Sequence, residues 1–371
     1  MTFNQKIICT VTNDLNQDQR MQRICTTLTE NGYTVTLVGR LKAHSIPLQI
    51  QNYHQIRLKC WYDRGFLFYL EYNIRLFRIL LSEKKVPFII YTVDSDTLVA
   101  GGIVKYLTGK KQIFDAHEYF TEVPELINKP IKRWIWQTIE NIFVPKADAH
   151  ITVSKSLADI FGNKFGKIFT PILNVPYLSV TSGQAKKPYL PVILYQGMLN
   201  KGRGLEQMIG AMEKINYALL FIIGEGDLSA SLRLLGANSP AANRIQFLGW
   251  KSADQMAEIS REATLAINLL ENSSLSYYYS LANKFFDYIH AGVPSVNMAF
   301  PEYIDIIKKY ELGVTISKLD QDLIAETINN LLGNHETLEQ MVVACKKACK
   351  IYCWENERQK LIETVDQMHL K

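Results

Sequence analysis

The sequence predicts an α/β protein made of two domains, each with a doubly wound parallel sheet. Short apolar runs alternate with amphipathic segments along most of the chain, which is the pattern of strand–helix–strand units. This alternation is interrupted once, between Asn174 and Pro191, and then restarts. The length of 371 residues fits about two domains of ordinary size, and a 47% hydrophobic content is enough for two large cores.

The first half contains five short apolar runs that predict strands. They cover residues 6–12, 35–38, 88–93, 112–114 and 150–153. Amphipathic segments between them predict helices at residues 20–30, 67–81, 96–107 and 134–143. Asn31-Gly32 ends the first of these helices, and Ser154 caps the fifth strand.

The interruption is the best candidate for a linker between domains. It carries Pro176, Pro188 and Pro191 around Thr181-Ser182-Gly183. After it, strands are predicted at residues 192–195, 218–223, 245–248 and 265–269, with a helix at 205–214. The predicted domains therefore cover residues 1–178 and 188–350, and a final helical segment covers 351–371.

Charge and hydropathy limit the possible partners and location. A net charge of +5 suits an enzyme of anionic substrates or a protein of the membrane surface, and is too weak and dispersed for nucleic acid. The first apolar run ends at Asn13, so it is no signal peptide. The apolar stretch at residues 65–81 contains Glu71, Arg75 and Arg78, so it does not span a bilayer. We expect a cytoplasmic protein.

The six cysteines are expected to stay reduced in that compartment. Cys345, Cys349 and Cys353 recur every four residues, which predicts one packed helix face. They lack the paired, short-spaced ligands of a zinc site.

Three predicted strand-end loops of the first domain carry chemically useful side chains. The first has Asp18 and Arg20, and the second has Asp94 and Asp96. This D-x-D spacing can ligate a divalent metal, but a helix follows directly, so both carboxylates can equally serve as N-cap and first-turn charges.

His117 lies in the third loop, Asp115-Ala116-His117-Glu118-Tyr119. An exposed imidazole after a strand can exchange hydrogen bonds with a substrate hydroxyl. A structural histidine bonded to a neighbouring loop is an equally good interpretation.

The segment from Ile127 to Trp136 combines basic residues with two tryptophans, which suits a membrane interface. A solvated helix with one buried tryptophan is the simpler interpretation.

Two stretches of the second domain suit a phosphate. The glycine-rich turn from Gly197 to Gly204 lets backbone amides approach an anion, and Lys201 and Arg203 add charge. The turn lacks the ending of a Walker loop, and Gly224-Glu225-Gly226 lacks the third glycine of a dinucleotide fingerprint.

The second stretch covers residues 277–294, where a helix starts after small and polar residues and ends at Gly292. Its N-terminus offers unpaired amides, Lys284 adds a charge, and Asp287 could accept hydrogen bonds from a sugar diol. An ordinary helix capped by Ser280 is the alternative.

Motifs spread over nearly the whole chain together resemble a retaining glycosyltransferase of family 4, with the GT-B fold. They are Asp18 and Arg20, Asp115–Glu118, Asp148–Ser154, Asn174–Pro176, Tyr195–Gly197, Arg203–Gly204, Phe247–Gly249, Asn283–Tyr288, Ala291–Pro294 and Trp354–Glu355.

The resemblance implies two Rossmann-like domains facing a central cleft, with the last helix crossing back to the first domain. It implies that the second domain binds the donor: Asp287 the ribose, Arg203 and Lys284 the diphosphate, and the loop of Gly249 and Trp250 the base. The remaining donor-binding residues that it implies are Gly197, Gly224, Leu281, Ala282 and Asn283.

In the first domain, the resemblance implies that His117 faces the transferred sugar and acts in catalysis with Arg203 and Lys284. The acceptor side would include Asp18, Arg20, Asp94 and Glu118 as well. The implied reaction moves a sugar, with retention, from a nucleoside-diphosphate sugar such as a UDP-sugar to a glycan or polyprenyl-linked acceptor. It would serve cell-surface polysaccharide synthesis at the inner membrane face, without a metal or other cofactor.

This chain departs from the family pattern at three positions. Met198 stands where an arginine is common, Tyr279 where a glutamate is common, and Asp287 where a longer glutamate is usual. Glu271 lies on the same loop as Tyr279 and could compensate for it. A catalytically silent GT-B protein, acting as a partner subunit or glycan-binding module, is therefore the main alternative, and a nucleotide-sugar epimerase is a third.

Overall fold

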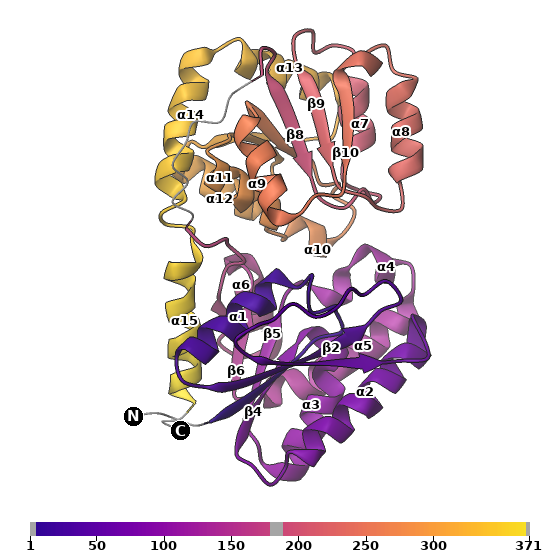
Figure 1. The fold of residues 1–371 in the computed structure, drawn as a ribbon, viewed down its shortest axis with the longest axis vertical. Coiled ribbons are helices and arrows are strands. Elements are labelled where there is room, and N and C mark those ends of the chain that lie inside the picture. The colour runs from indigo at the N-terminus through magenta and orange to yellow at the C-terminus, as the bar shows by residue number, and fades with distance from the viewer. Residues whose placement is uncertain (1–4, 179–187, 369–371) are drawn as a thin grey trace. The chain divides into compact units, whose positions relative to one another are not determined.

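The computed structural model describes residues 5–178 and 188–368, and these form two compact units (Figure 1). The first unit contains the residues up to Asn174 and those from Trp354 onward, and the second contains Val175 to Cys353. Residues 179–187, which include the Thr181-Ser182-Gly183 part of the predicted linker, lie outside the described residues.

The first unit is built on a parallel sheet of seven strands in the order β3-β2-β1-β4-β5-β6-β7. Its strands are β1 (Lys6–Thr10), β2 (Thr34–Leu41), β3 (His54–Lys59), β4 (Phe88–Val93), β5 (Gln112–Ala116), β6 (Ala149–Thr152) and β7 (Thr170–Pro171). The strand order reverses between β1 and β4, so the loops that follow these strands open a crevice at one edge of the sheet.

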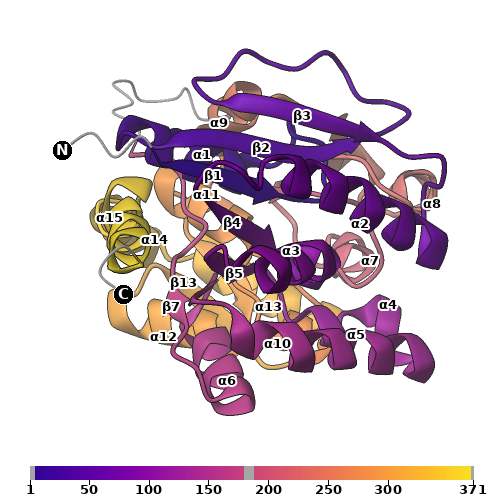
Figure 2. The same cartoon turned by 90° about the horizontal axis from the view of Figure 1, so that it is seen from below.

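Helices cover both faces of this sheet (Figure 2). They are α1 (Gln19–Glu30), α2 (Gly65–Ser82), α3 (Asp94–Thr108), α4 (Pro124–Ile127), α5 (Pro130–Phe143), α6 (Lys155–Phe165) and α15 (Trp354–Gln367). One core contains side chains of α1 and α15, and the other contains side chains of α2 and α3. Trp354 is fully buried in the first core, where its indole donates to Thr27 Oγ1 at 2.9 Å.

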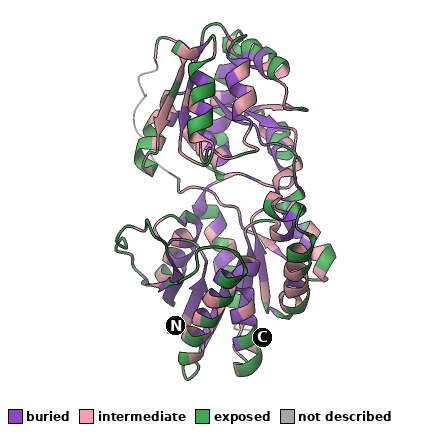
Figure 3. Ribbon diagram, turned by 90° about the vertical axis from the view of Figure 1, so that its right-hand side faces the viewer, coloured by how far each residue is buried: buried purple, intermediate pink, exposed green. Residues whose placement is uncertain are grey.

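The second unit has a parallel sheet of six strands in the order β10-β9-β8-β11-β12-β13. Its strands are β8 (Val192–Gln196), β9 (Leu219–Ile223), β10 (Ile245–Gly249), β11 (Leu265–Asn268), β12 (Ser295–Met298) and β13 (Gly313–Ile316). Its helices are α7 (Leu205–Ala211), α8 (Ser229–Ala237), α9 (Ala253–Glu262), α10 (Leu275–Tyr278), α11 (Asn283–Ala291), α12 (Pro301–Tyr310), α13 (Gln321–Leu332) and α14 (His335–Ala348). The strand order reverses between β8 and β11, and the strands of both sheets are largely buried (Figure 3).

These two parallel sheets confirm the predicted α/β, doubly wound fold. The sequence pattern missed strand β3, which is an edge strand with a single buried residue, Leu58. It also missed β12, because Ser295 and Asn297 interrupt its apolar pattern. Helix α5 begins four residues earlier than predicted, with Pro130 in its first turn, a position that proline favours.

The cysteine prediction was wrong in one respect. Helix α14 ends at Ala348, so Cys349 and Cys353 follow the helix and the three thiols do not share one helix face. All six cysteines are free. None of the helices in the described ranges is long and apolar enough to cross a membrane.

Candidate functional site

Three glycine turns meet at the carboxyl ends of β8, β9 and β10. Gly197 and Gly224 have φ angles of 132° and 129°, a region that side chains disfavour. A Cβ atom on Gly224 would lie 1.9 Å from the carbonyl oxygen of Gly197. The Gly224 amide donates to the Gly249 carbonyl at 2.9 Å. The predicted glycines of the donor side are therefore brought together.

Arg203 and Lys284 place two positive charges beside these turns. Arg203 Nε is buried without a hydrogen-bond partner in the described ranges, and its guanidinium lies 5.2 Å from the Tyr277 ring centre. Lys284 Nζ lies 3.8 Å from the centre of the Tyr195 ring. Burial, and then the charge of Arg203, lower the pKa of Lys284 well below its ordinary value. Within the described residues, neither cation forms an ion pair with a carboxylate.

Helix α11 begins at Asn283 and has no side-chain cap. Ala282 occupies the N-cap position with an extended backbone. The alternative of a Ser280 cap was wrong, because the Ser280 hydroxyl donates to the Tyr277 carbonyl instead. The Ala282 amide donates to the Tyr303 hydroxyl at 2.9 Å, so this one of the three predicted phosphate-binding amides already has a partner. Gly292, at φ 71°, ends the helix as predicted.

Asp287 is half-buried one turn into α11, and its Oδ2 accepts from Gln196 Nε2 at 2.8 Å. The sequence places Tyr195 and Gln196 in one of the family-like motifs, Tyr195–Gly197, but it predicts no role for either side chain. A glutamine at the end of the apolar run that predicts β8, just before Gly197, is the signal that could have identified Gln196.

Other predicted residues of the second unit lie on exposed loops. Trp250 is 74% exposed and Met198 is 58% exposed. The amide of Glu271 donates to the Gly202 carbonyl at 2.9 Å, so this acid lies against the glycine-rich turn. Tyr279 packs edge-on against Tyr278.

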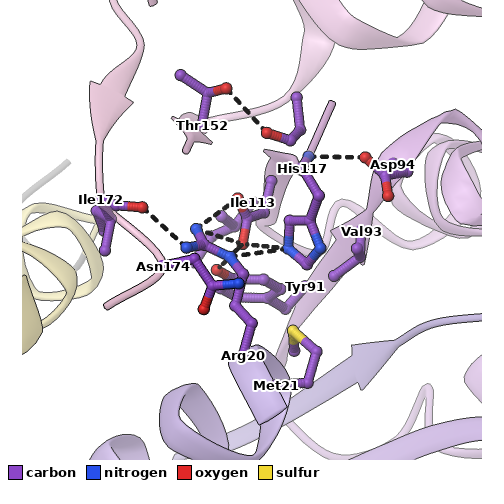
Figure 4. A network of polar contacts seen from close by, with 12 residues as sticks. Arg20, Met21, Tyr91, Val93, Asp94, Ile113, His117, Thr152, Ile172 and Asn174 are labelled. Carbon is purple, nitrogen blue, oxygen red and sulfur yellow. Dashed lines mark hydrogen bonds and ion pairs between the residues drawn. The ribbon is translucent and has the colours of Figure 1, made fainter. Parts of the chain in front are cut away.

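A buried ion pair organises the crevice edge of the first unit (Figure 4). Arg20 NH2 lies 3.1 Å from Asp115 Oδ1, and the two side chains are 3% and 0% exposed. Arg20 also donates to the Ile172 carbonyl at 2.8 Å, and the Tyr91 hydroxyl donates to Asp115 Oδ2 at 2.8 Å. Burial alone would raise the pKa of Asp115, but the charges of Arg20 and His117 hold it well below its usual range.

His117 is attached to this pair. Its Nε2 lies 3.0 Å from both Arg20 Nε and Asp115 Oδ2. A ring protonated only on Nδ1 accepts from Arg20, whereas a ring protonated on Nε2 donates to Asp115. Burial opposes the charge, but Asp115 and Asp94 together raise the pKa of His117, which favours the second arrangement. The ring is thus held by Asp115, two residues away, and its side chain is 17% exposed.

Asp94 and Asp96 lie in the first turn of α3, and neither is its N-cap. Asp94, at φ 51°, accepts the His117 amide at 2.7 Å, and Asp96 accepts from the Thr12 hydroxyl. Burial raises the pKa of each carboxyl to about 7. No three His, Cys, Asp or Glu side chains of the described ranges are grouped so as to hold a metal ion.

The remaining predicted residues of the first unit have different surroundings. Asp18 caps α1 by accepting the Met21 amide at 3.1 Å, and it also accepts from Asn13 at 3.0 Å. Glu118 is exposed. The structure therefore brings Arg20, Asp94 and His117 together around Asp115, while Asp18 completes a helix end.

Two family models match the chain in succession. Residues 18–172 match the model described as Glycosyltransferase Family 4, and residues 182–348 match the model described as Glycosyl transferases group 1. The comparison with curated proteins finds no match.

Solved glycosyltransferase structures share the fold. Sucrose-phosphate synthase from Thermosynechococcus elongatus is 16% identical, with a TM-score of 0.77 over 99% of this chain and 100% of its own. HepE from Anabaena, in complex with UDP, is 13% identical, with a TM-score of 0.75 over 98% and 100%. WaaG, a glycosyltransferase involved in lipopolysaccharide biosynthesis, is 13% identical, with a TM-score of 0.71 over 97% and 99%.

Proposed function

Because the chain belongs to the glycosyltransferases of family 4 and group 1, we propose that it transfers a sugar from a nucleoside-diphosphate sugar to an acceptor hydroxyl. The observation that carries the donor half of this proposal is the pair of Arg203 and Lys284. Lys284 is desolvated beside Arg203, whose Nε is buried without a hydrogen-bond partner in the described ranges, and Asp287 only partly offsets this cost in the protein without ligand. A diphosphate would neutralise both cations.

The proposed donor contacts follow from this placement. Arg203, Lys284 and the amides at the start of α11 bind the diphosphate, including those of Leu281 and Asn283. Asp287 accepts from the ribose hydroxyls through its carboxylate oxygens, which can take several hydrogen bonds at once. The exposed ring of Trp250 borders the base. We take UDP as the nucleotide, since HepE was solved with UDP and with UDP-glucose.

The proposed chemistry needs no metal and no side-chain nucleophile. Cleavage of the bond between sugar and phosphate builds negative charge on the diphosphate, which Arg203, Lys284 and the helix terminus stabilise. The acceptor attacks from the face that the diphosphate leaves, and the diphosphate takes the proton, so the configuration is retained. We assign the sugar and acceptor side to His117, with Asp18, Arg20, Asp94 and Glu118 around it.

The proposed acceptor is a glycan or a polyprenyl-linked sugar of a cell-surface polysaccharide, met at the inner face of the membrane. Helix α5 supports this, since Ile131 and Trp134 are 75% and 65% exposed beside the exposed Lys129 and Lys132. Trp136, in contrast, packs edge-on against aromatic neighbours. Flotation with anionic vesicles tests this point: Trp134→Ser should reduce co-migration, and absence of co-migration by the unmodified protein would refute membrane binding.

Donor binding is tested by thermal denaturation with a panel of nucleoside diphosphates and their sugars. UDP at 100 times its dissociation constant should stabilise the second unit by about 2.7 kcal/mol. EDTA should not change this stabilisation or the hydrolysis of the matching UDP-sugar. If no nucleotide of the panel binds and no nucleotide-sugar is hydrolysed, the proposal is wrong.

A catalytically silent partner subunit is the second candidate, because Met198 and Tyr279 replace residues common in the family. It predicts that Asp287→Ala leaves cellular function intact, whereas the enzyme predicts its loss. The position of Glu271 favours the enzyme, because its carboxylate lies beside the turn, with Oε2 3.4 Å from where a Cβ atom on Gly202 would be.

A further inference from the structure

The last two residues of β8, Tyr195 and Gln196, are buried and each contacts a proposed donor-binding side chain of α11. Their exposed fractions are 0% and 4%. Tyr195 contacts Lys284, and Gln196 contacts Asp287. A strand of the sheet thus supports both charged groups of the donor helix.

Tyr195 contacts the site with both ends of its side chain. Its ring lies 3.8 Å from Lys284 Nζ, and its hydroxyl donates to the Met198 carbonyl at 2.8 Å. A Cβ atom on Gly197 would lie 3.2 Å from the same Nζ, so the amine is held between the ring and the turn. Lys284 forms no ion pair with a carboxylate in the described ranges, so the ring face attracts its charge together with Asp287, which lies beyond ion-pair distance.

Gln196 fixes the orientation of Asp287. A carboxylate only accepts, so the Gln196 nitrogen must face Asp287 Oδ2, at 2.8 Å. The Gln196 oxygen then accepts from Ser260 Oγ at 2.9 Å. These two bonds fix the orientation of the side-chain amide, while the backbone N–H of Gln196 donates to the Tyr288 hydroxyl at 3.1 Å.

We propose that Tyr195 and Gln196 are positioning residues of the donor site. Tyr195 orients Lys284 toward the diphosphate, and Gln196 orients Asp287 toward the ribose hydroxyls. The inference rests on the proposed function, because it takes UDP as the occupant of this site.

Two variants separate the roles of the Tyr195 ring and hydroxyl. Tyr195→Phe keeps the ring, and should keep the UDP affinity within about threefold. Tyr195→Leu removes the ring, and should weaken UDP about tenfold or more while leaving uridine nearly unchanged. The readout is therefore the ratio of UDP to uridine affinity, which a general loss of packing would not change selectively.

The Gln196→Met variant keeps the size of the side chain and removes both amide bonds. It should reduce the preference for UDP over 2′-deoxy-UDP severalfold, because Asp287 is no longer held toward the ribose. The ratio of UDP to uridine affinity should stay that of the unmodified protein. Tyr195→Leu should thus change the ratio of UDP to uridine affinity, and Gln196→Met the ratio of UDP to 2′-deoxy-UDP affinity.

Leu220→Ala is the matched control for lost packing, since Leu220 is fully buried on the neighbouring strand β9 and touches no proposed donor group. It should lower the melting temperature without changing either ratio. If the unmodified protein binds UDP and the variants keep both ratios, or if Tyr195→Phe behaves as Tyr195→Leu, the inference is overturned and the proposed function stands. If the unmodified protein binds no UDP, the proposed function fails and the inference with it.

Discussion

At the scale of single residues, Lys284 shows how a binding group can lower stability. Its amine is desolvated and close to Arg203, so the protonated form is disfavoured in the protein without ligand. Because its pKa is lowered in the folded protein, Lys284 destabilises the fold increasingly as the pH falls below the ordinary pKa of a lysine. The protein tolerates this cost where an anion can relieve it.

Lys284→Met should therefore weaken UDP binding by about 30-fold and at the same time raise the melting temperature of the second unit slightly. Titration calorimetry and thermal denaturation at neutral pH measure the two effects. Lys201→Met is the control, because Lys201 is an exposed cation of the same turn and should change affinity by no more than about twofold. An equal loss in both variants would show that only net charge matters.

Asp96 gives the opposite case in the first unit, a carboxyl whose pKa is raised to about 7 mainly by burial. The stability associated with its protonated form is fully present below pH 3.8 and is lost as the pH rises through about 7. Asp96→Asn should consequently stabilise the first unit at pH 8, by about 2 kcal/mol, and change its stability little at about pH 3.5, below the ordinary pKa of an aspartate.

Urea denaturation at the two pH values checks this prediction. The amide oxygen of the asparagine can still accept from Thr12, so the hydrogen bond itself is kept. The same gain at both pH values would mean that ionisation of Asp96 is not the cause.

At the scale of elements, the turns at the ends of β9 and β10 depend on glycine for two different reasons. Gly224 needs both its positive φ and the close approach of the Gly197 carbonyl, whereas Gly249, at φ 68°, meets only the end of a flexible Glu225 side chain at 3.5 Å. A side chain at Gly224 would therefore clash with the neighbouring backbone, whereas a side chain at Gly249 would only strain the backbone conformation.

Gly224→Ala should destabilise the second unit by about 3 kcal/mol or more and abolish UDP binding, since the backbones must separate. Gly249→Ala should cost only about 1 kcal/mol. Chemical denaturation and UDP titration compare the pair, and equal effects would refute the argument from close approach.

The sequence predicted the strands whose burial is visible in the local pattern of apolar residues. Strands β4 and β8 are continuous apolar runs because both faces of a parallel sheet are covered. Strand β12 is different: Asn297 bonds to Ser295, at 2.9 Å, and accepts from Asn268 of β11, at 3.2 Å. The hydrogen bond between Asn297 and Asn268 forms only once β11 and β12 pair, so no local sequence pattern predicts it.

The residues of the candidate site divide in the same way, into those that a local motif predicts and those that depend on distant contacts. Its glycines, Arg203 and Lys284 lie in short local motifs, and these could be predicted. The bond from Gln196 to Asp287 joins positions 91 residues apart, and the pair of Arg20 and Asp115 joins positions 95 apart. Which residues orient the functional ones could therefore not be predicted from sequence.

At the scale of the whole molecule, α15 belongs to the core of the first unit although it ends the chain. Trp354→Ala removes a fully buried indole and its bond to Thr27, so it should destabilise the first unit by about 3–5 kcal/mol. Hydrogen exchange should show faster exchange in α1 and unchanged protection in α11. Gln359→Ala, at an exposed position of α15, is the control and should change neither helix.

The placement of α15 also bears on the order in which the chain folds during synthesis. The second unit is one continuous segment, so all of its strands have been synthesised before residue 354 is added. The first unit is synthesised first but lacks part of its core until the last residues emerge. A stalled nascent chain that ends at residue 353 and continues into a flexible linker long enough to span the exit tunnel should therefore carry a folded second unit and a protease-sensitive first unit, the reverse of their order in the sequence.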